Sequence, residues 1–404
     1  MTSSDASEGA GAPARRGRRF LEFFAGGGMA RIGLGEGWEC LWANDFDAAK
    51  CAAYRENFGG DHLVERDVAK VATADIPGRA DLAWASFPCQ DLSLAGARRG
   101  MRVGGSTRSS VFWAFWFLVE RLAAEGRAPR VLVIENVVGL ASASGHKDFA
   151  ALCGALAAGG YRYDAHVVDA AGFLPQSRPR LFVIAWKEEP PAHLLRRDGD
   201  GTPLPPKSLA TAFTRLAEAA PARRPLRLPA PPPRNLQLSD VVEEAPSDVR
   251  WRTAAETKRL LAMMTPRHLA RIEAAKAEAK RDGRPVAGAL YRRTRPDGEG
   301  GSVQRAEVRF DLAGCLRTPA GGSSRQTLVM VEPSGRVRTR LMSAREAARL
   351  MGLPDDYRLP RRYTDAYKLA GDGVAAPVAR WLAAQLIEPL LDHLDAQEAA
   401  AAAE

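Results

Sequence analysis

One stretch near the start of the chain restricts the fold more than any other. Residues 19–24 predict a strand, which runs directly into Ala25-Gly26-Gly27-Gly28 and then into residues typical of a helix. Glycines at such a turn accept positive φ and let the backbone approach a ligand closely. A strand, a glycine turn and a helix in this order are typical of the first unit of a doubly wound α/β sheet. The turn alone is compatible with NAD, FAD or S-adenosylmethionine (AdoMet), or with a tight turn that binds nothing.

Acidic residues follow the next two predicted strands. The strand Cys40–Ala43 leads to Asn44-Asp45-Phe46, and a strand around His62–Glu65 precedes Asp67-Val68. An acidic residue at the end of the second strand, about 20 residues beyond the glycines, is placed to bind ribose hydroxyls. Three strand ends of this kind predict a ligand that contains adenosine. An isolated Asp in such a place is more often a helix N-cap, and we expect Asp47 to be one.

A cysteine follows the fourth predicted strand. This strand, Asp81–Ala85, leads to Ser86-Phe87-Pro88-Cys89-Gln90. Open α/β sheets place their chemistry at the carboxyl ends of the strands. A free cysteine is also among the most frequently buried residue types, so Cys89 taken alone is compatible with a structural role.

Charged residues accompany the remaining strands of this region. The β-branched run Val131–Ile134 predicts a buried parallel strand and is followed by Glu135. Residues 161–170 and 180–186 predict two further strands, with Arg178 and Arg180 just before the second. Arginines on alternate residues of an extended segment project to the same side, so we expect their guanidinium groups to face one site.

The charge and the cysteine pattern narrow the class of protein. The 57 Lys and Arg residues exceed the 48 Asp and Glu residues, and a net charge of +9 favours a polyanionic partner such as nucleic acid. A basic enzyme without such a partner has the same excess. The five cysteines form no CxxC pair, which argues against a zinc cluster or a disulfide framework and for a reducing compartment. We find neither a signal peptide nor an apolar run long enough to span a membrane.

Taken together, these segments resemble the DNA cytosine-5 methyltransferases. The segments that match the family's motifs, in the family's order, are Phe24–Gly28 (AdoMet loop), Pro88-Cys89-Gln90 (nucleophile), Glu135-Asn136-Val137, Gln176–Arg180, and Arg345–Leu350 with Gly352 and Pro354. Near the end of the chain, Gly371-Asp372-Gly373-Val374 has Asp where the family usually has Asn.

The resemblance implies an α/β fold of the AdoMet-dependent methyltransferase type. We expect a Rossmann-like sheet with helices on both faces and a smaller, irregular target-recognition domain. The expected boundaries are a disordered tail at 1–17, the catalytic AdoMet-binding domain at 18–187, the target-recognition domain at 188–335, a segment at 336–395 that completes the catalytic domain, and a frayed tail at 396–404.

The resemblance also implies a reaction, in which a methyl group passes from AdoMet to C5 of a cytosine that has left its duplex. Cytosine C5 is a poor nucleophile until a thiolate, here Cys89, adds at C6. Glu135 would face N3, Arg180 would stabilise the charge on O2, and Arg178 would hold the loop or a phosphate.

The implied binding residues extend beyond these four. The AdoMet-binding residues would be Phe24, Ala25, Gly26, Gly27, Gly28, Asp45, Phe46, Asp67, Val68, Pro88, Val111 and Asp372. The DNA-contacting residues would be Gln90, Ser93, Arg98, Arg99, Arg293, Arg305 and Arg325, since these side-chain types on loops contact phosphates and base edges. We expect AdoMet but no metal, double-stranded DNA as the partner, and a monomer in the bacterial cytoplasm, associated with the nucleoid. A cognate restriction endonuclease is a further candidate partner.

Three alternatives remain open from the sequence. An RNA cytosine-5 methyltransferase, with tRNA as its substrate, would use the same fold and motifs. A DNA-binding relative that does not methylate is suggested by Asp372. A dinucleotide oxidoreductase is suggested only by the glycine turn and leaves Cys89, Glu135 and Arg180 unexplained.

Overall fold

The larger lobe of the protein is built on a seven-stranded sheet. The structure, a computed structural model, describes residues 17–88, 111–216, 221–296, 300–317 and 325–403. The sheet has the order β3-β2-β1-β4-β5-β7-β6. Its strands are β1 (Arg18–Phe23), β2 (Trp38–Asp45), β3 (Leu63–Glu65), β4 (Leu82–Ala85), β5 (Val131–Val137), β6 (Arg162–Asp169) and β7 (Pro179–Trp186). Neighbouring strands are parallel except that β7 is antiparallel to both β5 and β6. The predicted α/β sheet is therefore confirmed, including the two further strands at its edge, β6 and β7.

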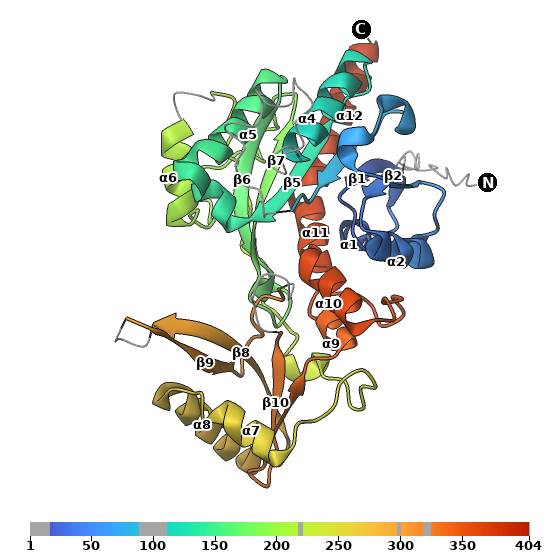
Figure 1. The fold of residues 1–404 in the computed structure, drawn as a ribbon. Helices are drawn as coiled ribbons and strands as arrows, with labels where there is room; N and C mark the ends of the chain where they lie inside the picture. Colours follow the sequence, from blue (N-terminus) through green and yellow to red (C-terminus); the bar gives the residue numbers. More distant parts are fainter. Residues whose placement is uncertain (1–16, 89–110, 217–220, 297–299, 318–324, 404) are drawn as a thin grey trace, which may run out of the picture.

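Helices cover both faces of this sheet because its central strands bury alternate side chains on opposite sides. On β5, Val131 and Val133 join one core, whereas Leu132 and Ile134 join the other. The first face is covered by α1 (Met29–Leu34), α2 (Ala48–Phe58), α11 (Ala376–Leu382) and α12 (Glu388–Ala403). The second face is covered by α4 (Val111–Ala124), α5 (Lys147–Ala158) and α6 (Lys207–Leu216). This arrangement confirms the Rossmann-like fold class (Figure 1).

The smaller lobe has a sheet of its own. Four antiparallel strands lie in the order β11-β10-β8-β9. They are β8 (Val286–Pro296), β9 (Ser302–Arg309), β10 (Thr327–Val331) and β11 (Val337–Leu341). Two helices, α7 (Ala254–Leu261) and α8 (Pro266–Asp282), pack on this sheet around a separate core, and Figure 1 shows the lobe standing apart from the larger one. The region is thus more regular than its Arg-rich and Pro-rich sequence suggests.

The last part of the chain returns from the smaller lobe to the larger one. Helices α9 (Ala344–Arg349) and α10 (Tyr363–Asp372) lie between the lobes, and α11, a π-helical segment Ala383–Ile387 and α12 follow (Figure 1). Ser343 followed three residues later by Glu346 is the sequence pattern of a capping box, and the structure has this box at the start of α9. Ser343 Oγ accepts from Glu346 N at 3.1 Å and Glu346 Oε2 accepts from Ser343 N at 2.8 Å. The tail that we expect to be frayed from residue 396 continues α12 to Ala403. Short 3₁₀ segments at Val68–Lys70, Thr73–Asp75, Val138–His146, Ala170–Gly172 and Leu238–Val241 complete the fold.

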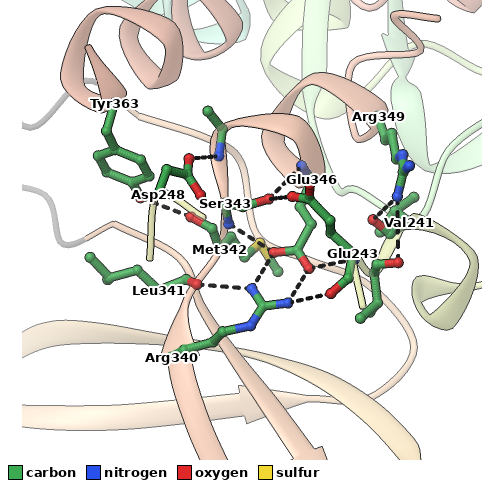
Figure 2. Close-up of polar contacts among 12 residues, drawn as sticks. Val241, Glu243, Asp248, Arg340, Leu341, Met342, Ser343, Glu346, Arg349 and Tyr363 are labelled. Carbon is green, nitrogen blue, oxygen red and sulfur yellow. Dashed lines mark hydrogen bonds and ion pairs between the residues drawn. The ribbon is translucent and has the colours of Figure 1, made fainter. Parts of the chain in front are cut away.

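A buried ion pair connects the segment that enters the smaller lobe before α7 to the segment that leaves it after β11. Arg340, at the end of β11, is 0% exposed and donates to both carboxylate oxygens of Glu346 at 2.6 and 2.7 Å. Its Nη2 also donates to the carbonyl oxygen of Glu243 at 2.9 Å, on the segment that leads into the smaller lobe. Ser343 Oγ donates to the Glu243 carboxylate at 2.7 Å (Figure 2). The segment entering the lobe and the segment leaving it are therefore tied to the same helix start.

Within the described residues, no helix combines the length and the apolar character needed to cross a membrane.

Candidate active site

One large cavity lies where the parallel strands of the larger lobe end. Its volume is about 1090 Å³, and the ends of β1, β2, β4 and β5 all contribute to its wall. The predicted site residues that line it are Phe24, Ala25, Gly26, Asp45, Phe46, Asp67, Val68, Pro88, Val111, Glu135, Arg180 and Asp372. Residues more than 300 positions apart in the sequence therefore share one cavity.

The glycine turn after β1 combines close packing with unusual backbone conformations. Phe24, Gly26 and Gly28 have φ of 57°, 56° and 74°. Gly27 is packed from behind by Tyr357, whose hydroxyl donates to the Gly27 carbonyl oxygen at 2.7 Å. A Cβ on Gly27 would lie 2.5 Å from that hydroxyl oxygen, so the turn requires glycine there. Gly27 and Gly28 thus support the turn, while Phe24, Ala25 and Gly26 line the cavity.

Asp45 braces the turn from the end of β2. Its Oδ2 accepts from Gly26 N at 2.8 Å, and its Oδ1 accepts from Asp47 N at 2.9 Å. Beside it, the Phe46 side chain is 68% exposed at the cavity wall, which is unusual for a large aromatic group. Asp67 begins a 3₁₀ segment by accepting from Ala69 N at 3.0 Å. The predicted cap is also present, since Asp47 Oδ1 accepts from Ala49 N and Lys50 N at 3.1 and 3.2 Å.

A carboxylate and a guanidinium group meet at the other end of the cavity. Glu135 on β5 is 5% exposed, and its Oε1 lies 3.2 Å from Arg180 Nε on the neighbouring strand β7. Asn136 Nδ2 donates to the carbonyl oxygen of Phe87 at 3.1 Å. This bond holds the strand end that leads through Pro88, itself a cavity residue, to position 89.

Arg178 is placed behind the cavity wall. It is 2% exposed, and its Nη2 donates to the carbonyl oxygens of Gly371 and Gly373 at 2.8 and 2.7 Å. Its Nη1 donates to the carbonyl oxygen of Leu316 at 3.2 Å. The side chain therefore holds the segment that ends α10 and begins the following loop, here the Gly371–Gly373 loop, on which Asp372 lies. The expectation that both guanidinium groups face one site is not met at the cavity, which Arg180 lines and Arg178 does not.

Other predicted residues either lie outside the described part of the chain or do not line this cavity. Cys89, Gln90, Ser93, Arg98 and Arg99 lie outside the described residues. Arg293 and Arg305 lie opposite each other on β8 and β9 of the smaller lobe, and the Arg325 guanidinium carbon lies 5.1 Å from the centre of the Tyr363 ring. Among the described residues, no group of three or more His, Cys, Asp or Glu side chains is arranged to hold a metal ion.

A family comparison decides the identity of this fold and site. The family model described as C-5 cytosine-specific DNA methylase matches residues 18–388. The chain belongs to this family. The resemblance noted in the sequence is thereby confirmed.

Individual relatives agree with this assignment. The chain is 25% identical over 372 residues to the Type II methyltransferase M.NlaX of Neisseria lactamica, covering 91% of this chain and 96% of the relative. It is 24% identical to the Type II methyltransferase M.HpaII of Haemophilus parainfluenzae, covering 92% and 89%. The crystal structure of the S. pombe Dnmt2 methyltransferase superposes with a TM-score of 0.56, covering 92% of this chain and 99% of that one. Its 16% identity makes this a likeness of fold.

Sequence reasoning missed several residues that line this cavity. Cys315 and Arg317 line the cavity from a loop beyond β9, and Lys50 and Lys368 line it from α2 and α10. Lys50 Nζ lies 2.8 Å from Asp372 Oδ2, and Lys368 Nζ lies 2.5 Å from Asp47 Oδ2. A lysine in a helix or a cysteine in a loop has no local sequence signal that predicts these contacts, because each depends on two distant segments.

Proposed function

We propose that the protein is a DNA (cytosine-5-)-methyltransferase that transfers a methyl group from AdoMet to C5 of a flipped-out cytosine in a specific duplex sequence. One observation carries the proposal. A single cavity contains Asp45, Phe46 and the glycine turn at one end and Glu135 with Arg180 at the other. This arrangement suits a reaction in which a nucleoside-containing donor and a base meet between the two ends.

The donor end of the cavity fits AdoMet by the chemistry of its residues. Phe46 presents an exposed ring for an adenine to stack on, and Asp45 presents a carboxylate at the strand end typical of ribose binding. Asp67 and Val68, on the neighbouring strand end, would contact the adenine edge. The turn at Gly26 leaves room for a close backbone approach. When bound, AdoMet supplies an electrophilic methyl group.

The opposite end of the cavity suits activation of a cytosine. Cys89, as the thiolate, would form a bond to C6, and electron density would move to C5. Glu135 would hold the proton or hydrogen bond at N3, and Arg180 would stabilise the negative charge on O2. Once C5 carries the methyl group, a base removes its proton and the C6–S bond breaks, which regenerates Cys89. Arg178 would act indirectly, by holding the Gly371–Gly373 loop.

The net charge of the chain and the names of its relatives support a proposal for the substrate and for the location in the cell. The relatives named above are Type II methyltransferases, and the basic net charge suits duplex DNA. We propose that the smaller lobe, from α7 to β11, recognises the target sequence and that the larger lobe is the catalytic domain. Two of the expected boundaries change, because α6, expected in the target-recognition domain at 188–335, packs on the large sheet, and β11, expected in the catalytic segment at 336–395, belongs to the small sheet. A duplex hides C5 and C6, so the base must leave the stack to reach the cavity. We further propose a cytoplasmic monomer near the nucleoid, with a cognate restriction endonuclease as a candidate partner.

Methyl transfer to DNA is the direct test. The full-length protein would be incubated with tritium-labelled AdoMet and either unmethylated bacterial DNA or tRNA, and the DNA product would be mapped by bisulfite sequencing. We expect label in DNA and protected cytosines at one recurring sequence. Label in tRNA alone would favour the RNA methyltransferase. Absence of label from both, with AdoMet bound, would favour a relative that does not methylate.

The covalent step has a separate test. A duplex that contains 5-fluorocytosine at the mapped site cannot lose a proton from C5, so the C6–S bond should persist through denaturation. We expect a shifted band with the wild type plus AdoMet, and none with Cys89→Ser or with the ordinary cytosine duplex. Cys89→Ser should bind DNA within about twofold of the wild type and transfer no methyl group. Methylation by this variant would contradict the assignment of Cys89.

A further inference from the structure

A cysteine lies in the cavity beside the two arginines. Cys315 lines the same wall region as Glu135 and Arg180 and is partly exposed. Its Sγ accepts from Arg178 Nη1 at 3.3 Å and from Arg180 Nη2 at 3.7 Å. One sulfur atom therefore joins the arginine that holds the Gly371–Gly373 loop to the arginine that faces Glu135.

The charges around this sulfur favour its anionic form. Arg178 is almost fully buried, and a buried guanidinium group is costly unless negative charge lies beside it. Burial, together with the nearby Arg180, lowers the pKa of Arg178 to about 10. The Glu135 carboxylate already faces Arg180 at 3.2 Å. Among the described residues, Cys315 is the acidic group that is hydrogen-bonded to the Arg178 guanidinium group, so it is placed to balance the second positive charge.

The titration of Cys315 follows the same geometry. Burial raises the pKa of its thiol, but Arg178, Arg180 and Arg317 more than offset this effect and lower the pKa below its ordinary value. Tyr367 also faces the sulfur, and its own pKa is raised to about 12, chiefly by burial. The contrast lies within the chain itself, because burial raises the pKa of both Cys40 and Cys51 to about 12.

We propose that Cys315 is a positioning residue, whose thiolate holds Arg180 against Glu135 and Arg178 beneath the Gly371–Gly373 loop. The proposal rests on the proposed function for its catalytic meaning, because it concerns how Arg180 and Glu135 are aligned toward the base. It has a chemical consequence that does not depend on catalysis. The cavity then contains a reactive sulfur, that of Cys315, and an alkylating reagent that enters the cavity forms a bond to this sulfur as halide leaves.

Site-resolved alkylation tests the state of the sulfur directly. The native full-length protein would be treated with iodoacetamide between pH 5.5 and 9.5, and the rate at each cysteine would be measured by mass spectrometry of its peptide. We expect the rate at Cys315 to rise at a lower pH than at the same peptide of the denatured chain. The buried Cys40, Cys51 and Cys153 should remain unmodified and serve as internal controls.

A substitution of Arg180 tests whether the two arginines cause the reactivity of Cys315. Arg180→Gln removes one of the two donors to the sulfur, so we expect the midpoint for Cys315 to move to higher pH. Arg281→Gln, which changes an exposed arginine paired with Asp282 on the smaller lobe, should leave it unchanged. A native midpoint at or above that of the denatured chain, or no reaction at Cys315, would overturn the proposal.

Cysteine variants test the positioning role. We expect Cys315→Ala to bind S-adenosylhomocysteine within about twofold of the wild type by calorimetry, yet to transfer methyl groups about 10- to 100-fold more slowly, since small misplacements at a reacting centre have effects of this size. Cys315→Ser should also be slow, because a hydroxyl stays neutral, whereas Cys315→Asp should be faster than both. In the wild type, the methylation rate should fall at low pH as the Cys315 thiolate becomes protonated. This part of the pH–rate profile should be absent in all three variants.

The outcomes separate the two proposals. Wild-type rates and an unchanged pH–rate profile in Cys315→Ala and Cys315→Ser would overturn the positioning role. If the wild type methylates no cytosine, the proposed function fails, while the alkylation experiment still decides whether the sulfur is ionised. Should Cys315→Ala fail to fold, the alkylation of the native protein decides in the same way.

Discussion

Glu22, at the end of β1, is the most deeply buried carboxyl group of the cavity wall. It is 1% exposed, and its Oε1 accepts from Arg31 N at 3.3 Å. Its Oε2 has no hydrogen-bond partner among the described residues. Burial, and to a lesser extent the nearby Asp45, raises the pKa of Glu22 to about 8 against the opposing effect of Arg31. The carboxyl group is therefore protonated in the folded protein at a pH where the unfolded chain has lost the proton.

This shift predicts a pH dependence of stability. Below pH 4.5 the carboxyl is protonated in both states and its stabilising contribution is complete, whereas between pH 4.5 and 8 only the unfolded chain releases the proton, so folding stability falls. We expect the free energy of unfolding of the wild type to fall relative to that of Glu22→Gln over this range, by at most about 5 kcal/mol. Urea denaturation at pH 5 and pH 8 measures it. Glu39→Gln, at an exposed position of β2, is the control and should track the wild type. Parallel curves for the wild type and Glu22→Gln would contradict the assignment.

A charge pair at the donor end of the cavity leads to a second prediction at this scale. Lys50 lies 2.8 Å from Asp372, the position at which the family usually has Asn. Removing either partner leaves the other charge at the cavity wall, so Lys50→Gln and Asp372→Asn should each weaken S-adenosylhomocysteine binding by about five- to tenfold. The double variant should lose less than the product of the two single losses. Calorimetry on the four proteins measures the coupling, and purely multiplicative losses would show that the pair does not matter for binding.

Among the elements, the β8–β9 hairpin concentrates positive charge. Arg293 and Arg305 lie directly opposite each other, an arrangement of like charges that destabilises a hairpin unless negative charge is nearby. Glu307 partly compensates, since its Oε2 lies 3.8 Å from Arg293 Nε and its Oε1 also pairs with Arg295. A phosphate backbone laid along the hairpin would relieve the remaining repulsion.

This arrangement predicts salt-dependent DNA binding by the hairpin. Arg293→Gln with Arg305→Gln should weaken binding to duplexes of any sequence and reduce the slope of log K against log salt by about 2. Fluorescence anisotropy between 50 and 200 mM salt measures the slope. Two arginines exposed elsewhere, changed as Arg281→Gln with Arg121→Gln, carry the same loss of charge and should change the slope by less than half as much. Equal effects of the two double variants would mean that only net charge matters.

At the scale of the whole molecule, a few side chains that are almost completely buried hold the two lobes together. Arg340 and Glu346 are 0% and 1% exposed, and the Glu346 carboxylate makes a further bond, because its Oε1 also accepts from Glu243 N at 2.9 Å. Asp248 Oδ2 accepts from Ala344 N at 2.8 Å, and Tyr363 donates to the Met342 carbonyl oxygen at 2.8 Å (Figure 2). The relative placement of the lobes therefore depends on α9 together with the two chain segments to which Glu243 and Arg340 belong.

Removing one partner of this buried pair should be severe. Glu346→Gln leaves the Arg340 guanidinium without its counter-charge, and we expect the free energy of unfolding to fall by about 3–5 kcal/mol. Asp355→Asn is the control, because Arg349–Asp355 is a similar ion pair from the same helix with an Asp side chain that is 65% exposed, and its loss should cost less than about 1 kcal/mol. Chemical denaturation measures both variants. Losses of similar size would mean that the Arg340–Glu346 pair contributes no more than a surface pair.

The sequence alone was sufficient to predict the structural features that depend on a strand end or on a helix cap. The order of strands and polar residues led to the α/β sheet, to Asp47 as a cap and to the Ser343–Glu346 capping box, because each depends on neighbours a few residues away. Likewise, the motifs around Glu135 and Arg180 were enough to expect that they face one site, and the structure places them 3.2 Å apart.

The pairing of distant segments was decided only by the tertiary structure. Arg178 and Arg180 differ by two positions, yet one is buried behind the cavity wall and the other faces it, because the Gly371–Gly373 loop offers carbonyl groups to the first. Lys50 with Asp372, Cys315 with the two arginines, and Arg340 with Glu243 likewise join segments that meet only after the sheet has formed. Local sequence determines which residues end a strand or begin a helix, whereas the charges that those residues meet are set by packing across the whole chain.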